Sequence, residues 1–210
     1  MNILTVPVGP LQANCYLVSD DTMACAIDPG GEPERLVQIL TERGLQLTHV
    51  LLTHGHFDHM AGAAQLAEAT GALVACHENT APMLRDPNDY IPFPGFDGIP
   101  GREPDVLLAD GDTLQVGSLV VSTVATPGHS PGDVTYAIGG ALFCGDLLFY
   151  RSVGRTDFPG GDFETLLASV RRLAEAFPRE TRVFPGHMQP TTLGDELAAN
   201  PFLAGLTPRG

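Results

Sequence analysis

Six consecutive residues, His54-Gly55-His56-Phe57-Asp58-His59, constrain this chain more than any other segment. They follow the apolar stretch Val50-Leu51-Leu52-Thr53, which has the composition of a buried β-strand. The chain has 7 histidines in 210 residues, so three within this hexapeptide form a marked cluster. Protonated imidazoles so close together repel one another, whereas a divalent ion stabilises them, because imidazole and carboxylate are ligands that zinc prefers. We therefore expect a metal site at a strand end rather than a polar surface turn.

The periodicity of the rest of the chain predicts an α/β protein. Strands are expected at residues 3–8, 15–19, 23–27, 48–53, 72–76, 114–116, 119–125, 134–138, 141–144 and 182–184. Helices are expected at residues 32–43, 62–70, 163–177 and 192–199. Residues 85–104 are rich in proline, glycine and aspartate without a period, which predicts a long surface loop.

Four candidate ligands each come shortly after a predicted strand: His54, His129, Asp146 and His187. Strand ends meet at one edge of a sheet, so residues far apart in the sequence can converge there, and rigid strands fix ligand geometry better than free loops do. His129 and His187 each follow a Pro-Gly pair, in which glycine allows the tight turn that presents an imidazole.

The hexapeptide itself has the spacing for two metal positions. His54 and His56 are two residues apart, so in an extended segment they point to the same side and can share one ion. Asp58 and His59 follow where the chain is expected to turn into a helix, and they can face a second ion. Asp146 could bridge the two ions.

Charge and composition exclude several classes of function. The net charge is −14, from 25 acidic and 11 basic residues, and such a surface repels nucleic acid at long range. No apolar run reaches the ~18 residues of a membrane span, and the N-terminus lacks the features of a signal peptide, so we expect a cytoplasmic protein. The 4 cysteines form no Cys-x-x-Cys pair and are expected to be reduced core residues. No feature indicates an oligomeric state.

Taken together, these segments resemble the metallo-β-lactamase superfamily, and within it the glyoxalase II-like branch. The matching pieces are Thr53-His54-Gly55-His56-Phe57-Asp58-His59, Pro127-Gly128-His129-Ser130, Cys144-Gly145-Asp146 and Pro185-Gly186-His187, with Ala26-Ile27-Asp28-Pro29-Gly30 before them. The resemblance covers nearly the whole chain in the right order. It implies an αββα sandwich, with two mixed β-sheets flanked by helices, in a single domain spanning residues 1–210. Only a short segment follows His187, so the C-terminal helical domain of full-length glyoxalase II is expected to be missing.

The resemblance also implies a ligand set for two divalent ions, with zinc expected and iron or manganese as alternatives. Carried over residue by residue, the first site consists of His54, His56 and His129, and the second of Asp58, His59 and His187, with Asp146 bridging them. A metal that lowers the pKa of water towards about 7 would supply hydroxide to attack a thioester carbonyl. Asp58 is the candidate catalytic residue, because it can accept a hydrogen bond from that hydroxide.

The substrate is expected to be a small-molecule thioester such as S-lactoylglutathione. β-Lactamases of this fold commonly lack a carboxylate at the place of Asp146, which resembles instead the thioesterase, dioxygenase, diiron and nuclease branches. A thiolate, with a conjugate pKa of roughly 8.5, leaves without a strong general acid, whereas an amide nitrogen needs one. The alternatives are an iron-dependent persulfide dioxygenase, another ester or lactone hydrolase of this fold, and a non-catalytic metal-binding module.

Four further residues have two interpretations each. Arg151 and Arg155 lie in a segment that resembles the Gly-Arg loop of glyoxalase II relatives, and they could bind a substrate carboxylate or form surface ion pairs. Tyr150 could line the pocket or pack in the core. Asp28 could orient a metal ligand through hydrogen bonds or simply form an Asp-Pro-Gly turn. Met188-Gln189 replaces a tyrosine-containing segment that often follows the last ligand histidine in this branch.

Overall fold

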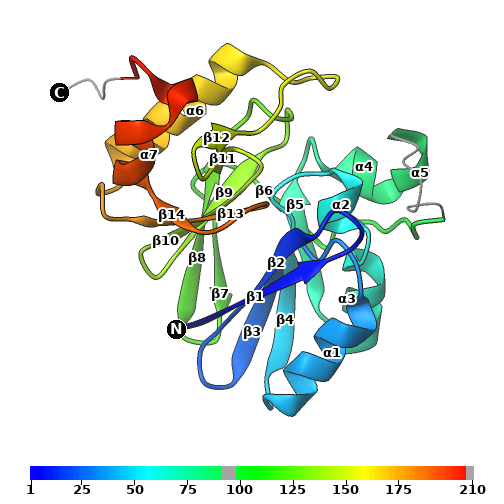
Figure 1. Ribbon diagram of the computed structural model, residues 1–210. Helices are drawn as coiled ribbons and strands as arrows, with labels where there is room; N and C mark the ends of the chain where they lie inside the picture. The colour runs from blue at the N-terminus through cyan, green and yellow to red at the C-terminus, as the bar shows by residue number, and fades with distance from the viewer. Residues whose placement is uncertain (91–97, 207–210) are drawn as a thin grey trace.

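Two six-stranded mixed sheets pack against each other in the computed structural model, which describes residues 1–90 and 98–206, and helices cover their outer faces (Figure 1). The first sheet has the order β1 (Asn2–Val8), β2 (Ala13–Ser19), β3 (Met23–Ile27), β4 (Gln46–Leu51), β5 (Leu73–His77) and β6 (Val106–Leu108). The second has the order β14 (Thr191–Thr192), β13 (Arg182–Pro185), β10 (Ala141–Gly145), β9 (Val134–Ile138), β8 (Leu119–Ala125) and β7 (Thr113–Val116). The predicted αββα sandwich of two mixed sheets is confirmed.

Three apolar layers explain why the chain folds into a sandwich. The central layer joins the two sheets, with Tyr16, Ile27 and Leu51 from the first sheet against Tyr136 and Phe143 from the second. Every residue of β2 is buried, as a strand in the middle of such a stack requires. The burial of these large side chains supplies the main driving force that holds the sheets together.

The two outer layers fix the helices. On the first sheet lie α1 (Pro33–Glu42) and α3 (Ala63–Thr70), and on the second lie α6 (Phe163–Ala176) and α7 (Leu193–Ala199), which η1 (Pro201–Leu203) follows. Leu36 and Leu40 of α1 and Leu166 and Val170 of α6 face inwards, at the helical spacing that the sequence predicts. Asp162 caps α6 by accepting a hydrogen bond from the Thr165 backbone N–H.

Short elements complete the fold and correct part of the prediction. The expected loop at residues 85–104 is wrong at one place, where α5 (Pro87–Tyr90) follows α4 (Ala81–Arg85), and residues 91–97 of it lie outside the described part. Proline is favoured in the first turn of a helix, which accounts for α5 in a segment otherwise typical of loops. The patterns also missed the short strands β6, β14, β11 (Leu148–Phe149) and β12 (Ser152–Val153), which tertiary pairing stabilises.

Two composition-based predictions concern the core and the membrane. All 4 cysteines are free and buried, as expected for reduced core thiols. Among residues 1–90 and 98–206, no helix has both the length and the apolar character needed to cross a bilayer.

Candidate metal centre

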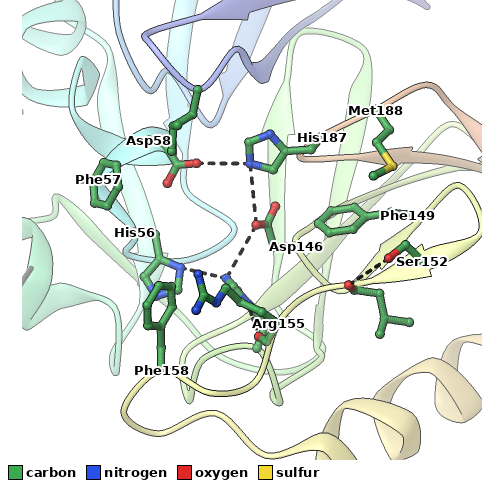
Figure 2. A pocket seen from close by; sticks show the side chains of 13 residues that line it. His56, Phe57, Asp58, Asp146, Phe149, Ser152, Arg155, Phe158, His187 and Met188 are labelled. Atoms are coloured by element: carbon green, nitrogen blue, oxygen red, sulfur yellow. Dashed lines mark hydrogen bonds and ion pairs between the residues drawn. The ribbon is translucent and has the colours of Figure 1, made fainter. Parts of the chain in front are cut away.

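The seven predicted ligands converge on one edge of the sandwich, where strands of both sheets end. His54 and His56 lie in the loop after β4, and Asp58 and His59 belong to the short helix α2 (Phe57–Met60). Three more side chains come from the second sheet, because His129 follows β8, Asp146 follows β10 and His187 follows β13. All are buried except His187 and Asp146, which are partly exposed. Figure 2 shows Asp58, His187, Asp146 and His56 facing one another around a common space.

Within this cluster, the candidate ligand atoms fall into two groups. Those of His54, His56 and His129 lie within 4.8 Å of one another, and so do those of Asp58, His59 and His187. This division matches the two expected metal sites.

Asp146 lies between the two groups. One of its carboxylate oxygens is 3.3 Å from Nε2 of His59, and the other is 3.7 Å from Nε2 of His129 and 3.7 Å from Nε2 of His187. The carboxylate is therefore placed where a bridging ligand would have to be.

Unsatisfied buried atoms indicate that the cluster fits metal ions. Nε2 of His54, Nε2 of His59 and Oδ1 of Asp146 are buried and have no hydrogen-bond partner among the described residues. A buried polar atom without a partner costs free energy, and native structures rarely keep several together without an ion or water. A set of imidazole and carboxylate donors suits borderline divalent metals. The cluster thus has both the donor chemistry and the free ligand atoms of a centre for two divalent ions.

A hydrogen-bond chain through Asp28 fixes the imidazoles of both groups. Asp28 Oδ1 accepts the backbone N–H of Thr53 at 2.7 Å, and Oδ2 accepts the Thr53 hydroxyl at 2.6 Å. Because that hydroxyl donates its proton to Asp28, its oxygen accepts a hydrogen bond from Nδ1–H of His54, 3.0 Å away. Oδ2 also accepts Nδ1–H of His59 at 3.0 Å. In both histidines the Nε2 lone pair is left for a metal.

Asp28 itself lies close enough to His54 and His59 to form a third potential group. Its oxygens are already occupied by the three hydrogen bonds from Thr53 and His59, which favours the orienting role over a ligand role. It also adopts a left-handed backbone conformation, with φ 52°, at the turn that the sequence predicts. Asp28 therefore lies in the predicted turn and also accepts the hydrogen bonds from Thr53 and His59.

The third imidazole of the first group is held by the opposite side of the pocket. Nδ1–H of His129 donates to the carbonyl oxygen of Arg155 at 2.7 Å, which again leaves Nε2 for a metal. Nε2 of His129 accepts a hydrogen bond from Nδ1–H of His56, 2.8 Å away, and a metal ion bound between these nitrogen atoms would replace the shared proton. Asp133 closes the turn after His129 by accepting the Ser130 backbone N–H at 2.6 Å.

Three of the pKa shifts in the cluster favour the neutral imidazole that binds a cation, and one opposes it. Burial lowers the pKa of His54, His56 and His129, that of His56 to about 4, and the imidazoles around His54 and His56 lower theirs further. Burial also opposes a charge on His59, but Asp146 and Asp58 outweigh it and raise its pKa. Metal binding needs neutral imidazoles, and three of the four in this set remain neutral at pH 7.

Two glycines allow the ligands to approach one another. A Cβ on Gly186 would collide with Oδ1 of Asp146 and with Cε1 of His59. A Cβ on Gly154 would collide with the backbone oxygen of Asp146. The Pro-Gly-His turn before His187 therefore needs glycine for space, beyond the backbone freedom argued from the sequence.

A pocket of about 410 Å³ opens beside the cluster. Five candidate ligands line it together with eight other residues: Leu11, Phe57, Phe149, Ser152, Val153, Arg155, Phe158 and Met188. Arg155 is thus at the pocket, but its guanidinium makes two hydrogen bonds of 2.6 Å to the Asp157 carboxylate.

Two expected substrate-binding residues lie elsewhere. Arg151 is not among the pocket residues, and its guanidinium donates to buried Glu196 at 2.9 Å and stacks over Tyr150, 4.8 Å from the ring centroid. Tyr150 also lies outside the pocket lining and is 40% exposed. The structure places both in an arrangement that ties the loop after Asp146 to α7.

Sequence patterns did not single out three positions that shape the site. Nδ2 of Asn14 donates to the carbonyl oxygens of Pro185 at 3.0 Å and Met188 at 2.9 Å, so it clamps the turn that carries His187. Glu196 is fully buried and holds Arg151 and Asn200. Phe149 lines the pocket beside His187. A lone amide, carboxylate or phenyl ring carries no spacing signal, so the sequence offered none for these three residues.

The chain has sequence relatives along most of its length. Residues 8–187 match the family model described as the metallo-beta-lactamase superfamily. The probable metallo-hydrolase YqgX of Bacillus subtilis is 37% identical over 206 residues, which are 96% of this chain and 97% of the relative. Hydroxyacylglutathione hydrolase GloC of Haemophilus influenzae is 37% identical over 208 residues, which are 97% of this chain and 98% of the relative.

Solved structures share the fold, and one of them is described with two iron ions bound. The BLEG-1 B3 metallo-beta-lactamase has a TM-score of 0.90 and 37% identity, covering 97% of this chain and 100% of the other. TTHA1623, solved in a di-iron-bound form, has a TM-score of 0.79 and 40% identity, covering 95% of this chain and 100% of the other. ETHE1 from Myxococcus xanthus has a TM-score of 0.83 and 32% identity, covering 98% of this chain and 85% of the other.

Proposed function

Because the chain belongs to the metallo-β-lactamase superfamily, we propose that it is a metal-dependent hydrolase that cleaves a thioester such as S-lactoylglutathione. The observation that carries the proposal is the pair of ligand groups on either side of Asp146, opening into a pocket of about 410 Å³. A metal site that opens to a pocket is typical of catalysis, whereas structural sites are closed by protein ligands. The relative GloC is named a hydroxyacylglutathione hydrolase, which supports the same chemistry.

In this proposal, His54, His56 and His129 hold one ion, and Asp58, His59 and His187 hold the other, with Asp146 between them. Bound by these residues, divalent ions would supply Lewis-acid chemistry, which polarises a carbonyl and lowers the pKa of water to about 7. Zinc is the expected metal. Asp28, Thr53 and the Arg155 carbonyl favour the tautomer of His54, His59 and His129 that carries its proton on Nδ1 and not on Nε2.

Asp58 is proposed to orient the attacking oxygen. It faces the pocket, and its Oδ2 lies 3.2 Å from Nε2 of His187. Burial opposes its ionisation, but His59 and His187 keep its pKa below the ordinary value, so it is a hydrogen-bond acceptor at neutral pH. This position allows it to accept a hydrogen bond from the attacking oxygen and so to aim that oxygen at a carbonyl carbon.

The pocket favours a leaving group that needs no acid. The carboxyls among its described residues are Asp58 and Asp146, and both have a lowered pKa, so neither donates a proton at pH 7. A thiolate leaves readily, with a conjugate pKa of roughly 8.5, whereas an amide nitrogen must be protonated as it leaves. This asymmetry favours a thioester over a β-lactam, although the similar BLEG-1 structure is described as a β-lactamase.

One alternative keeps the same cluster and changes the metal. TTHA1623 binds two iron ions and is 40% identical to this chain, which supports iron as a second candidate. With iron, the corresponding activity would be the oxidation of a persulfide by O₂.

Metal analysis and activity on one sample separate these possibilities. We expect inductively coupled plasma mass spectrometry to find two zinc ions per chain, and the same sample to hydrolyse S-lactoylglutathione but not a chromogenic cephalosporin. Iron with oxygen uptake on a persulfide, and no thioester hydrolysis, would replace the proposal by the dioxygenase. Turnover of the cephalosporin alone would contradict both.

A further inference from the structure

We infer that the pocket selects thioesters with an aliphatic or aromatic arm over glutathione conjugates, and that Phe149, Met188 and Leu11 bind this arm; the inference rests on the proposed hydrolase function. A thioester has two arms, the acyl group and the thiol, and either can carry the apolar group. The same apolar residues of the pocket would bind the apolar group whether the acyl side or the thiol side of the thioester carries it.

Apolar side chains flank the ligand cluster on two sides. Phe149 packs beside His187, with 6.0 Å between the ring centroids, and Phe158 packs beside His56, at 5.4 Å. In Figure 2, Phe149 and Met188 lie on the side of His187, and Phe57 and Phe158 on the side of His56. On the side of His56 the Arg155 guanidinium lies over the Phe158 ring, 4.0 Å from its centroid, so the side of His187, with Phe149 and Met188, is the apolar side for a substrate held over Asp146.

The described residues offer little to a glutathione moiety. A glutathione carries carboxylates and peptide groups, which need cations and hydrogen-bond partners. Apart from the histidines of the cluster, Arg155 is the one cationic residue among the described residues of the pocket lining, and Asp157 already accepts two of its hydrogen bonds. The net charge of −14 also repels an anionic substrate at long range.

Exposed apolar residues mark the mouth of the pocket. Met188 is 57% exposed and Leu11 is 41% exposed, although both are large and apolar. Exposed apolar residues that gather at a pocket are typical of binding sites. A bound apolar arm would remove their surface from water, which is the main source of affinity in such pockets.

The backbone at Met188 is held in an uncommon conformation. Its φ of 68° lies in the left-handed region, which residues other than glycine rarely adopt. The Asn14 amide holds this conformation, because its Nδ2 donates to the carbonyl oxygen of Met188 at 2.9 Å. Such strained positions collect at functional sites. The clamp directs an exposed methionine to the mouth of the pocket.

Two substrate series test the inference with the metal-loaded full chain. In the first, the acyl group of N-acetylcysteamine thioesters grows from acetyl to octanoyl, and in the second, the thiol of acetyl thioesters grows from ethyl to octyl. We expect kcat/KM to rise roughly threefold to fourfold per methylene in at least one series until the pocket is filled. The series that rises identifies the arm, and S-lactoylglutathione is expected to be the poorer substrate.

Variants of residues at the mouth of the pocket test which side chains cause the rise in kcat/KM. The double variant Leu11→Gln/Met188→Gln alters exposed positions, so it is expected to fold, and it should flatten the rise to less than twofold per methylene. Leu107→Gln is the matched control, because Leu107 is 52% exposed on β6 and lies outside the pocket lining, and it should keep the full rise.

The possible results distinguish a failure of the apolar subsite from a failure of the proposed thioester hydrolase function. Flat series with thioester hydrolysis, or a preference for S-lactoylglutathione, would overturn the apolar subsite and leave the hydrolase intact. A rise that survives in the double variant would overturn the assignment to Leu11 and Met188. No hydrolysis of any thioester would overturn the proposed function and the inference with it.

Discussion

Replacing Asp28 with asparagine is expected to weaken metal binding at both ligand groups without disturbing the backbone. Asparagine has the shape of aspartate and tolerates the left-handed conformation, φ 52°, that this position adopts. The substitution therefore changes the charge and one acceptor atom. Alanine would add backbone strain at this left-handed position and would remove both acceptor oxygens, so it would not isolate the change of charge and of one acceptor atom.

The hydrogen-bond chain shows why no orientation of an asparagine amide suits this position. If the amide NH₂ replaces Oδ2, it faces Nδ1–H of His59, 3.0 Å away, and forces that imidazole to move its proton to Nε2. It also turns the Thr53 hydroxyl towards Nδ1 of His54, so that His54 protonates at Nε2 as well. If the NH₂ replaces Oδ1 instead, it meets the Thr53 backbone N–H, 2.7 Å away. The first arrangement therefore protonates the nitrogen atoms that would bind metal, and the second sets two donors against each other.

Loss of an orienting partner behind a ligand histidine typically costs a factor of ten to a hundred in metal affinity, or about 1.4–2.8 kcal/mol. Because Asp28 acts on His54 of one group and His59 of the other, we expect Asp28→Asn to lose at least tenfold in affinity at both sites. Competition with a fluorescent zinc chelator at pH 7.5 measures the two constants. Asp162→Asn is the control, because asparagine also caps a helix, here α6, and its zinc affinity should not change.

Binding of both ions by Asp28→Asn within threefold of the wild type would show that Asp28 does not orient the two histidines. Circular dichroism and the Tm of the metal-free variant distinguish a local effect from unfolding. A loss at one site alone would show that Asp28 orients one of the two histidines.

Three other perturbations follow from the contacts of the site and the surface. Gly186→Ala should lower the metal content from two ions per chain towards one, because its Cβ collides with Asp146, and an unchanged content by mass spectrometry would contradict this. Glu196→Gln breaks the pair with Arg151, whose side chain is 34% exposed, so we expect a loss of about 2 kcal/mol in urea unfolding, below that of a fully buried pair. The backbone N–H groups around Asp20 lower its pKa from the ordinary value of 3.8, so the Asp20 carboxylate stabilises the fold above that pH and loses this contribution as the pH falls below it. The difference in Tm between the wild type and Asp20→Asn should therefore shrink below about pH 4. A difference that stays constant would argue against this role of Asp20.

The sequence alone was sufficient for the parts of the fold that rest on local periodicity. Strands and helices with clear apolar patterns, such as β8 and α6, lie where they are predicted to within a residue or two. Elements stabilised by distant partners were missed: β6 pairs with β5 in parallel across about thirty residues of chain, and β14 is too short to carry a pattern.

Within the site, the sequence predicted which residues meet, because their spacing and their positions after strands are local facts. It could not decide between the two interpretations given for Asp28 and for Arg151. Asp28 is occupied by Thr53 and His59, and Arg151 turns away from the pocket to Glu196. Such roles depend on partners that only the fold brings near, 45 residues apart in the case of Arg151 and Glu196.

The most direct test of the account is anomalous X-ray diffraction from crystals of the metal-loaded protein, recorded on both sides of the zinc absorption edge. We expect two anomalous peaks per chain, one among His54, His56 and His129 and one among Asp58, His59 and His187, with the Asp146 carboxylate between them. One peak, or peaks away from these side chains, would contradict the two-metal centre on which the proposed function depends.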